Sequence, residues 1–88
     1  MVYVVSFNPE TDEIRNKVVG VLRTYTSYCP IHRYCWAVET EEKAVAIRDK
    51  IKAVLSPQSS VFVIRSGTEA AWFNSYGEKN NKWLKEKL

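Results

Sequence analysis

The sequence has few of the residues that build common phosphate-binding and metal-binding sites. Glycine occurs only at positions 20, 67 and 77, so no glycine-rich loop that could cradle a phosphate is encoded. One histidine and two cysteines form a Cys29-x2-His32-x2-Cys35 string, and no further cysteine or histidine completes a four-ligand zinc site. On a strand, residues 29 and 35 share a face and residue 32 points to the other, unless Pro30 distorts the path. We therefore expect buried thiols and a partly exposed imidazole rather than a metal site.

The same scarcity argues against nucleophilic catalysis and a structural disulfide. His32 could pair with Cys29 or Cys35, but no nearby Asn or Asp is recognisable as the orienting third group.

No apolar run approaches the roughly 18 residues of a membrane span, and Met1 leads into a strand without a charged leader. We expect a cytoplasmic protein, in which two cysteines do not form a structural disulfide.

Length and charge indicate a small domain with an uneven field. The chain of 88 residues is 45% hydrophobic, which suffices for one modest core, and pairing with a second copy would bury more apolar surface. We therefore expect a homodimer. Residues 1–42 carry four basic and six acidic side chains, whereas residues 43–88 carry nine basic and four acidic ones. The net charge of +5 on the second half suits a polyanion or an acidic protein, although scattered lysines also occur on ordinary solvated faces.

Hydrophobic patterning predicts a βαββαβ order. Residues 2–7 and 60–65 are continuous apolar strands, and residues 26–39 have the composition of a hairpin or bent strand around Pro30. A first helix is expected to start at an Asn8 cap and run to about residue 25, and a second to start at a Thr40 cap. This order predicts an α+β, ferredoxin-like domain with an antiparallel sheet and both helices on one face.

The last third of the chain is expected to extend this core. We predict a ferredoxin-like core over residues 1–67 and a helical C-terminal extension over residues 68–88 of the same single domain. The extension would comprise a short helical turn at residues 68–72, a loose loop at residues 74–77 and a terminal helix with Trp83, Leu84 and Leu88. This tail could cover the sheet edge or a partner subunit.

Three segments carry a family resemblance over essentially the whole chain. They are the first strand, Tyr3-Val4-Val5-Ser6-Phe7-Asn8; the strand Cys35-Trp36-Ala37-Val38-Glu39-Thr40; and a tail in which Gly67-Thr68-Glu69-Ala70-Ala71-Trp72 precedes Lys82-Trp83-Leu84-Lys85. In these segments the chain resembles the SinR-like small proteins of the ferredoxin-like group related to the CRISPR-associated adaptation endonuclease and virulence-associated protein D.

The resemblance implies a dimer, and for the nuclease branch it implies a divalent metal held by an aspartate at the end of the first strand of each subunit. Asn8 stands at that position, and a neutral amide removes one negative charge per subunit from such a site. Asp12 is expected to interact with the dipole of the first helix instead. No catalytic residue, metal or other cofactor is therefore predicted, and Mg²⁺ would be needed only by a residual nuclease.

Aromatic and basic residues favour a binding function. Tyr25, Tyr28, Tyr34 and Trp36 alternate with Arg23 and Arg33, and such groups stack on bases and contact phosphates. Core packing is the alternative for the aromatic residues, above all for Trp36. Lysines surround Trp83-Leu84 in the tail, where they could also serve solubility alone. The predicted nucleic-acid-binding residues are Arg23, Tyr28, Arg33, Tyr34, Lys79 and Lys82.

Three functions are compatible with these patterns. The first is a non-catalytic dimeric module that binds nucleic acid, RNA in preference to DNA, or a nucleic-acid-handling protein. The second is a protein inhibitor or antitoxin-like partner that docks through a sheet edge or the tail. The third is a residual metal-dependent endoribonuclease in which Asp12 or Glu10 replaces the missing acid.

Overall fold

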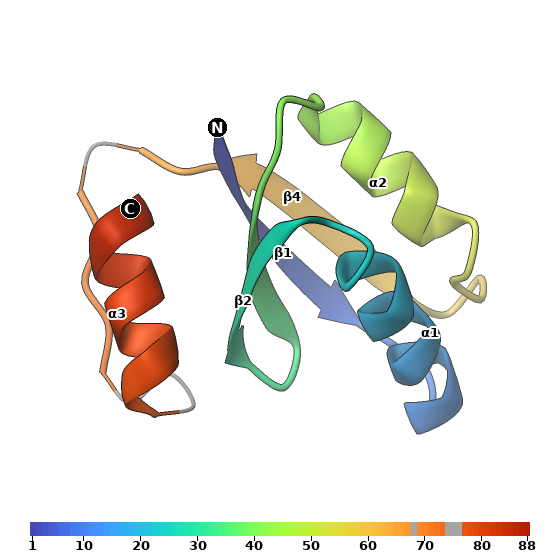
Figure 1. Cartoon of the computed structure of the whole chain (residues 1–88). Coiled ribbons are helices and arrows are strands. Elements are labelled where there is room, and N and C mark those ends of the chain that lie inside the picture. The colour runs from blue at the N-terminus through green and yellow to red at the C-terminus, as the bar shows by residue number, and fades with distance from the viewer. Residues whose placement is uncertain (68, 74–76) are drawn as a thin grey trace.

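A computed structural model describes residues 1–67, 69–73 and 77–88, which form four strands and three helices (Figure 1). The elements follow the order β1 (Val2–Asn8), α1 (Asp12–Leu22), β2 (Ser27–His32), β3 (Cys35–Glu39), α2 (Ala44–Lys52), β4 (Ser60–Arg65) and α3 (Glu78–Lys87). The strands form one sheet in the order β2-β3-β1-β4, and every neighbouring pair is antiparallel. The predicted α+β class is confirmed, and the arrangement is compatible with a ferredoxin-like fold.

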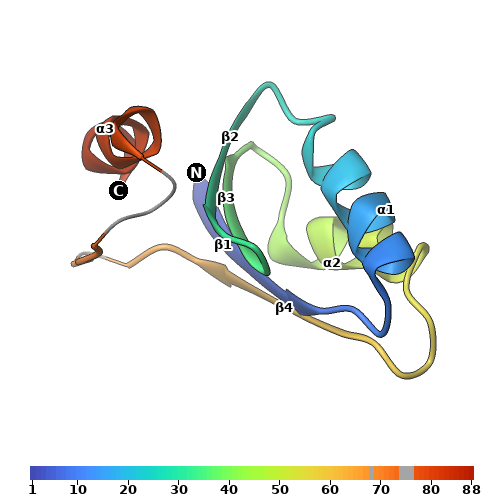
Figure 2. The same cartoon turned by 90° about the horizontal axis from the view of Figure 1, so that it is seen from below.

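The main core lies between the sheet and the helices α1 and α2, which cover the same face (Figure 2). Side chains alternate between the two faces of a strand, so Tyr3, Val5 and Phe7 of β1 all point into this core. They meet apolar side chains of both helices, including the fully buried Leu22, Ile47 and Ile51. The alternation of β1 and the helical spacing of these residues thus build one packed layer.

Helix α3 lies on the opposite face of the sheet, where it closes a second, smaller cluster (Figure 2). Leu84 is 1% exposed and packs with Val2, Cys29 and Ala37. The indole Nε1 of Trp83 donates a hydrogen bond to the Ser27 hydroxyl at 3.2 Å. Helix α3 therefore covers the β2 side of its own sheet, and Trp83, Leu84 and Leu88 pack within the chain.

Both main helices begin later than the sequence predicts. Asn8 does not cap α1, because it remains in the sheet opposite Ser60; Thr11 is the cap, and its Oγ1 accepts a hydrogen bond from the Ile14 N–H. Thr40 likewise is not the N-cap of α2: its N–H donates to the Met1 carbonyl, its Oγ1 accepts a hydrogen bond from the Glu42 N–H at 3.1 Å, and the helix begins only after Lys43. The strand pairing therefore extends through both positions, and Thr40 stabilises a turn that precedes the helix.

The short helical turn predicted at residues 68–72 is wrong for residues 69–72, which form no helix or strand. A single turn gains too few hydrogen bonds to offset its nucleation cost, and only packing would stabilise it. Residues 68 and 74–76, which belong to this turn and to the predicted loop, lie outside the described part of the chain. In the described ranges, no helix has the length and apolarity needed to cross a membrane.

Candidate nucleic-acid interface

The predicted nucleic-acid-binding residues lie on two faces of the molecule. Tyr28, Arg33 and Tyr34 belong to the β2–β3 hairpin. Arg23 is the C-terminal cap of α1, and α1 packs on the face of the sheet that bears the main core. Lys79 and Lys82 belong to α3, on the opposite face of the sheet. The structure therefore separates the hairpin residues from the tail lysines, which the sequence could not distinguish.

Arg33 and Tyr34 form a compact pair at the tip of the hairpin. The guanidinium carbon of Arg33 lies 5.6 Å from the centroid of the Tyr34 ring, and its Nε donates a hydrogen bond to the Tyr34 hydroxyl at 3.2 Å. Arg33 Nη2 also lies 3.0 Å from Asp12 Oδ1, at the first turn of α1. Hydrogen bonds with the Tyr34 hydroxyl and then with Asp12 raise the pKa of Arg33. The side chain is thus fixed in position as a solvent-accessible cation.

Arg15 is a further member of this group that the sequence analysis did not select. Its Nε donates a hydrogen bond to the Arg33 carbonyl oxygen at 3.1 Å, which joins α1 to the tip of the hairpin. Its position one turn after Asp12 gave no sign of this contact, because the two partners are 18 residues apart in the sequence.

Aromatic rings line the same hairpin. Tyr28 stacks on Trp36 with ring centroids 5.5 Å apart, and Tyr34 meets Phe7 edge to face at 6.4 Å. Tyr28 and Tyr34 are 37% and 40% exposed, whereas Trp36 is buried in the core, as core packing predicts. The Trp36 Nε1 is buried without a hydrogen-bond partner in the described structure. The hairpin thus carries two accessible tyrosine rings, one stacked on the buried Trp36 and one against the buried Phe7.

Arg23 and Arg33 lie at opposite ends of α1. Arg33 contacts Asp12, the first residue of the helix, and Arg23 caps its C-terminus. An 11-residue helix is about 16 Å long, at about 1.5 Å per residue. The two guanidinium groups are therefore spaced along the edge formed by α1 and β2, rather than gathered in one pocket.

The lysines of α3 form a separate basic stripe. Lys79, Lys82 and Lys85 are exposed and follow one another at three-residue intervals, so they lie along one side of the helix. Lys87 instead pairs with Glu39 at 3.1 Å, and the hydrogen bond from Lys87 is the main reason that the pKa of Glu39 is lowered. Within the described ranges, no ion pair neutralises the three-lysine stripe.

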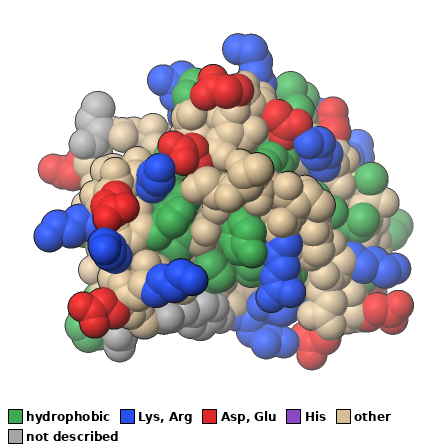
Figure 3. Space-filling model, viewed as in Figure 1, with side chains coloured by type: hydrophobic (Ala, Val, Ile, Leu, Met, Phe, Trp, Pro, Cys, Tyr) green, Lys and Arg blue, Asp and Glu red, His purple; other side chains and the backbone are tan. Residues whose placement is uncertain are grey.

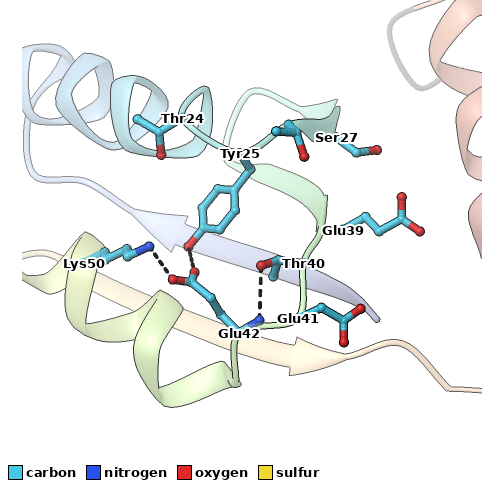
Figure 4. Close-up of a pocket in the computed structure, with 9 residues that line it drawn as sticks. Thr24, Tyr25, Ser27, Glu39, Thr40, Glu41, Glu42 and Lys50 are labelled. Atoms are coloured by element: carbon cyan, nitrogen blue, oxygen red, sulfur yellow. Dashed lines mark hydrogen bonds and ion pairs between the residues drawn. The ribbon is translucent and has the colours of Figure 1, made fainter.

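An open hollow of about 490 Å³ lies where β3 ends, and it is acidic (Figure 4). Glu39, Glu41 and Glu42 line it together with Tyr25 and Lys50. The Tyr25 hydroxyl donates to Glu42 Oε1 at 2.7 Å, and Lys50 pairs with Glu42 Oε2.

Burial and the hydrogen bond to Glu42 raise the pKa of Tyr25, while Lys50 and then Tyr25 lower the pKa of Glu42. The sequence analysis placed the start of the second helix at Thr40 and so missed this network. Its negative charge disfavours the binding of a polyanion within the hollow itself.

The residues considered for catalysis and metal binding are engaged elsewhere or dispersed. Asn8 is exposed at the end of β1, and Asp12 is paired with Arg33. Burial raises the pKa of Cys29 to about 11, so this thiol is protonated at neutral pH, and His32 Nδ1 accepts a hydrogen bond from the Tyr34 N–H at 3.3 Å. Among the described residues, no group of three or more His, Cys, Asp or Glu side chains could hold a metal ion.

Charged side chains of both signs are interspersed over the face seen in Figure 3, around hydrophobic side chains near its centre. On this face, the basic side chains do not form one continuous positive patch. In comparisons with known proteins, no family model matches the chain and no curated protein matches it significantly.

Proposed function

We propose that the protein is a non-catalytic module that binds single-stranded nucleic acid, RNA in preference to DNA, and acts as a homodimer of ferredoxin-like domains. The binding surface is the edge formed by α1 and the β2–β3 hairpin, which we call the hairpin edge and define by Arg23, Tyr28, Arg33 and Tyr34. The observation that carries the proposal is the exposed Tyr34 ring, which is 40% exposed and lies beside the fixed guanidinium group of Arg33. The exposed Tyr28 ring, on the same hairpin, adds a second stacking surface.

The chemistry of the hairpin edge suits an unpaired strand. Exposed aromatic rings stack on splayed bases, at about 1–3 kcal/mol per base by alanine substitution, and every base offers a face for this contact. Arginines at both ends of α1 can contact phosphates spaced along the same strand. Proteins that bind RNA often contact the unpaired bases of loops and ends, where the 2′-hydroxyl supplies an additional donor and acceptor.

The hydrogen bonds of Arg33 favour this role over a purely structural one. Asp12 and Tyr34 hold the guanidinium group in place, yet 51% of the Arg33 side chain is exposed. A positioned but accessible cation loses less side-chain entropy on binding than a free one. The lysine stripe of α3 lies on the other face of the sheet and would add only non-specific attraction.

The test measures binding of fluorescently labelled single-stranded RNA and DNA of the same sequence by anisotropy, over a series of salt concentrations. The variant is Arg23→Gln with Arg33→Gln, because glutamine removes the charge without placing a second carboxylate beside Asp12. We expect at least a tenfold loss of RNA affinity and a shallower salt dependence, since each phosphate contact removed lowers the slope by about 0.7 for a single strand.

The matched control is Lys43→Gln with Lys52→Gln, which removes the same charge from exposed positions at the two ends of α2. This variant is expected to bind RNA nearly as well as the parent. Equal losses in the two variants would reduce the effect to net charge, and no binding of RNA or DNA by the parent protein would reject the proposal.

Exposed apolar side chains favour a second candidate function, that of a protein-binding partner of the inhibitor or antitoxin-like kind. Phe62 is 62% exposed and Phe73 is 89% exposed. Because α3 is docked on its own sheet, such a partner would bind these exposed side chains and not the buried face of α3. A pull-down split into nuclease-treated and untreated halves separates the two functions: a stoichiometric protein that survives nuclease treatment supports this one.

A further inference from the structure

The strand β4 is an unprotected sheet edge. It pairs only with β1, and among the described residues no other segment hydrogen-bonds to its outer side. Natural edge strands usually carry a proline, an inward-pointing charge, a bulge or a cover that prevents further pairing. β4 has none of these between Ser60 and Ile64, and its only charged residue is the terminal Arg65.

The hydrogen-bond phase of the sheet identifies which groups of β4 face outward. The Ser66 N–H donates to the Val2 carbonyl, so Ser66 and Val2 form a hydrogen-bonded pair. In an antiparallel ladder, hydrogen-bonded pairs recur at every second residue. Ile64 and Phe62 therefore bond to β1, while the N–H and C=O groups of Val61, Val63 and Arg65 point away from the sheet.

We propose that β4 pairs with β4 of a second copy, antiparallel and centred on Val63, so that two sheets join into one. This inference rests on the homodimer of the proposed function and names its interface. In this register Val63 faces Val63 of the second copy, and Val61 faces Arg65 of the second copy. Every outward-facing backbone group of β4 then has a partner, whereas a shift by one residue in either direction leaves some unpaired.

The exposed side chains of β4 match one another in the same register. Phe62 and Ile64, which are 62% and 52% exposed, point to the face that bears α3 and would each lie opposite the other residue of the second copy. Aromatic and β-branched side chains in directly opposed positions are favourable cross-strand pairs. A hollow of about 220 Å³ beside Ile64, lined by Val4, Ala70 and Leu88 among others, lies next to the entering Phe62 ring.

Charge and the opposite face are compatible with the pairing. Each Arg65 would face a valine, and the two Arg65 side chains would be about four residues apart along the strands, so no like charges are opposed. On the α2 face, Val45, Val61 and Val63 line a shallow groove that continues the apolar surface of the edge. Arg48, in the same groove, lies 2.8 Å from its counter-charge Asp49.

Disulfide trapping tests the register. Phe62→Cys and Ile64→Cys proteins are made separately in a Cys35→Ser background, one of them with a size tag; the buried Cys29 is retained. Residues 62 and 64 of opposite copies would form a non-hydrogen-bonded pair with Cα atoms about 4.5 Å apart, within the disulfide range. We expect the mixture to form a cross-linked dimer of intermediate size, and each protein alone to cross-link more slowly because its own sulfurs are diagonal.

The substitution Phe62→Lys measures how strongly the β4 contact stabilises the dimer. Phe62→Lys should raise the dissociation constant of the dimer about 100-fold, because the substitution occurs twice in each interface. Phe73→Lys is the matched control: it is more exposed and lies outside β4, so it should leave the dimer intact. Light scattering during size-exclusion chromatography over a dilution series measures both, and circular dichroism verifies folding.

The outcomes distinguish this inference from the proposed function. Suppose that the parent is a dimer. If the Phe62→Cys protein alone then cross-links as fast as its mixture with the Ile64→Cys protein, or if neither protein cross-links alone or mixed, the β4 interface is overturned and the homodimer is retained. Equal weakening by Phe62→Lys and Phe73→Lys would also overturn the β4 interface. A parent that stays monomeric at every concentration would overturn both the interface and the homodimer, while the anisotropy assay still reports on nucleic-acid binding separately.

Discussion

The two edges of the sheet differ in whether their outward-facing backbone groups can pair with a further strand. On β2, the pairing phase directs Tyr28 and Pro30 outward, and Pro30 has no N–H to offer a further strand. The pairing of β2 with β3 is also irregular between Pro30 and His32, and α3 packs against this side of the sheet. On β4, valines present complete pairs of donors and acceptors without a cover.

Among the described residues, the chain itself covers the β2 side of the sheet, whereas no segment pairs with the outer side of β4, which is the edge of the proposed dimer contact. The ten residues of α3 bury Leu84 and bond Trp83 to Ser27 at the β2 side. At β4, by contrast, no segment in the described part of the chain hydrogen-bonds to the outer side. Long apolar edges of this kind carry an aggregation risk that proteins normally remove.

The largest effect should come from removing the α3 contact. Leu84→Ala deletes a side chain that is 1% exposed, and large-to-small changes at such sites cost about 2–5 kcal/mol of the free energy of unfolding. Ile64→Ala, at a position that is 52% exposed, should cost less than about 1 kcal/mol in the monomer. Urea unfolding at a protein concentration below dimerisation measures both.

Similar losses of the free energy of unfolding in the two variants would mean that α3 adds little to the stability of the β2 side of the sheet. The two edges would then not differ in stability. A large loss for Ile64→Ala that appears only at high protein concentration would instead sharpen the distinction, because it would assign the stabilisation to association at β4.

The sequence predicted the elements better than their ends. Continuous apolar strands and helical spacing were sufficient for the βαββαβ order and the helical tail, because burial of one face produces these periods directly. The starts at Asn8 and Thr40 were wrong because both residues still belong to the sheet pairing, which depends on distant residues, and the helices begin only after Thr11 and Lys43. For the same reason, the contrast between β2 and β4 was not readable until the strand order was known.

The candidate site was predictable only in its chemistry. Tyr28 and Tyr34 were selected as residues that tolerate a wet edge, and both are partly exposed. What the sequence could not supply was the contact of Arg33 with Asp12, or the separation of Lys79 from the hairpin by the thickness of the sheet. These arrangements follow from tertiary packing between segments that are remote along the chain.

A smaller effect is expected from restoring the missing donor on β2. Pro30→Val places an outward-facing N–H on this edge and should change the stability of the monomer by less than about 1 kcal/mol, since β-propensity differences span about that range. It should, however, increase self-association through β2 when combined with Leu84→Ala, because both devices that protect the edge are then weakened. Sedimentation velocity compares the double variant with each single one, and unchanged association would show that Pro30 does not protect the edge.

The smallest effect concerns pH. It acts through the ion pair between Lys87 of α3 and Glu39 of β3. The hydrogen bond from Lys87 lowers the pKa of Glu39, and Lys50 with Tyr25 lowers that of Glu42. A carboxylate with a lowered folded pKa stabilises the protein fully above its unfolded pKa of about 4.3, and this contribution is lost as the pH falls through the lower folded value. The midpoint of urea unfolding should therefore decrease modestly below about pH 4.

Glu39→Gln should reduce this acid dependence by removing the titrating group, and Glu41→Gln, which removes the same charge from a 95% exposed neighbour, is the control. If Glu39 acts through α3, acid should also increase amide exchange in α3 before it affects β4. Simultaneous exchange in both would show that the ion pair does not fasten the cover, and that α3 is held by Leu84 and Trp83 alone.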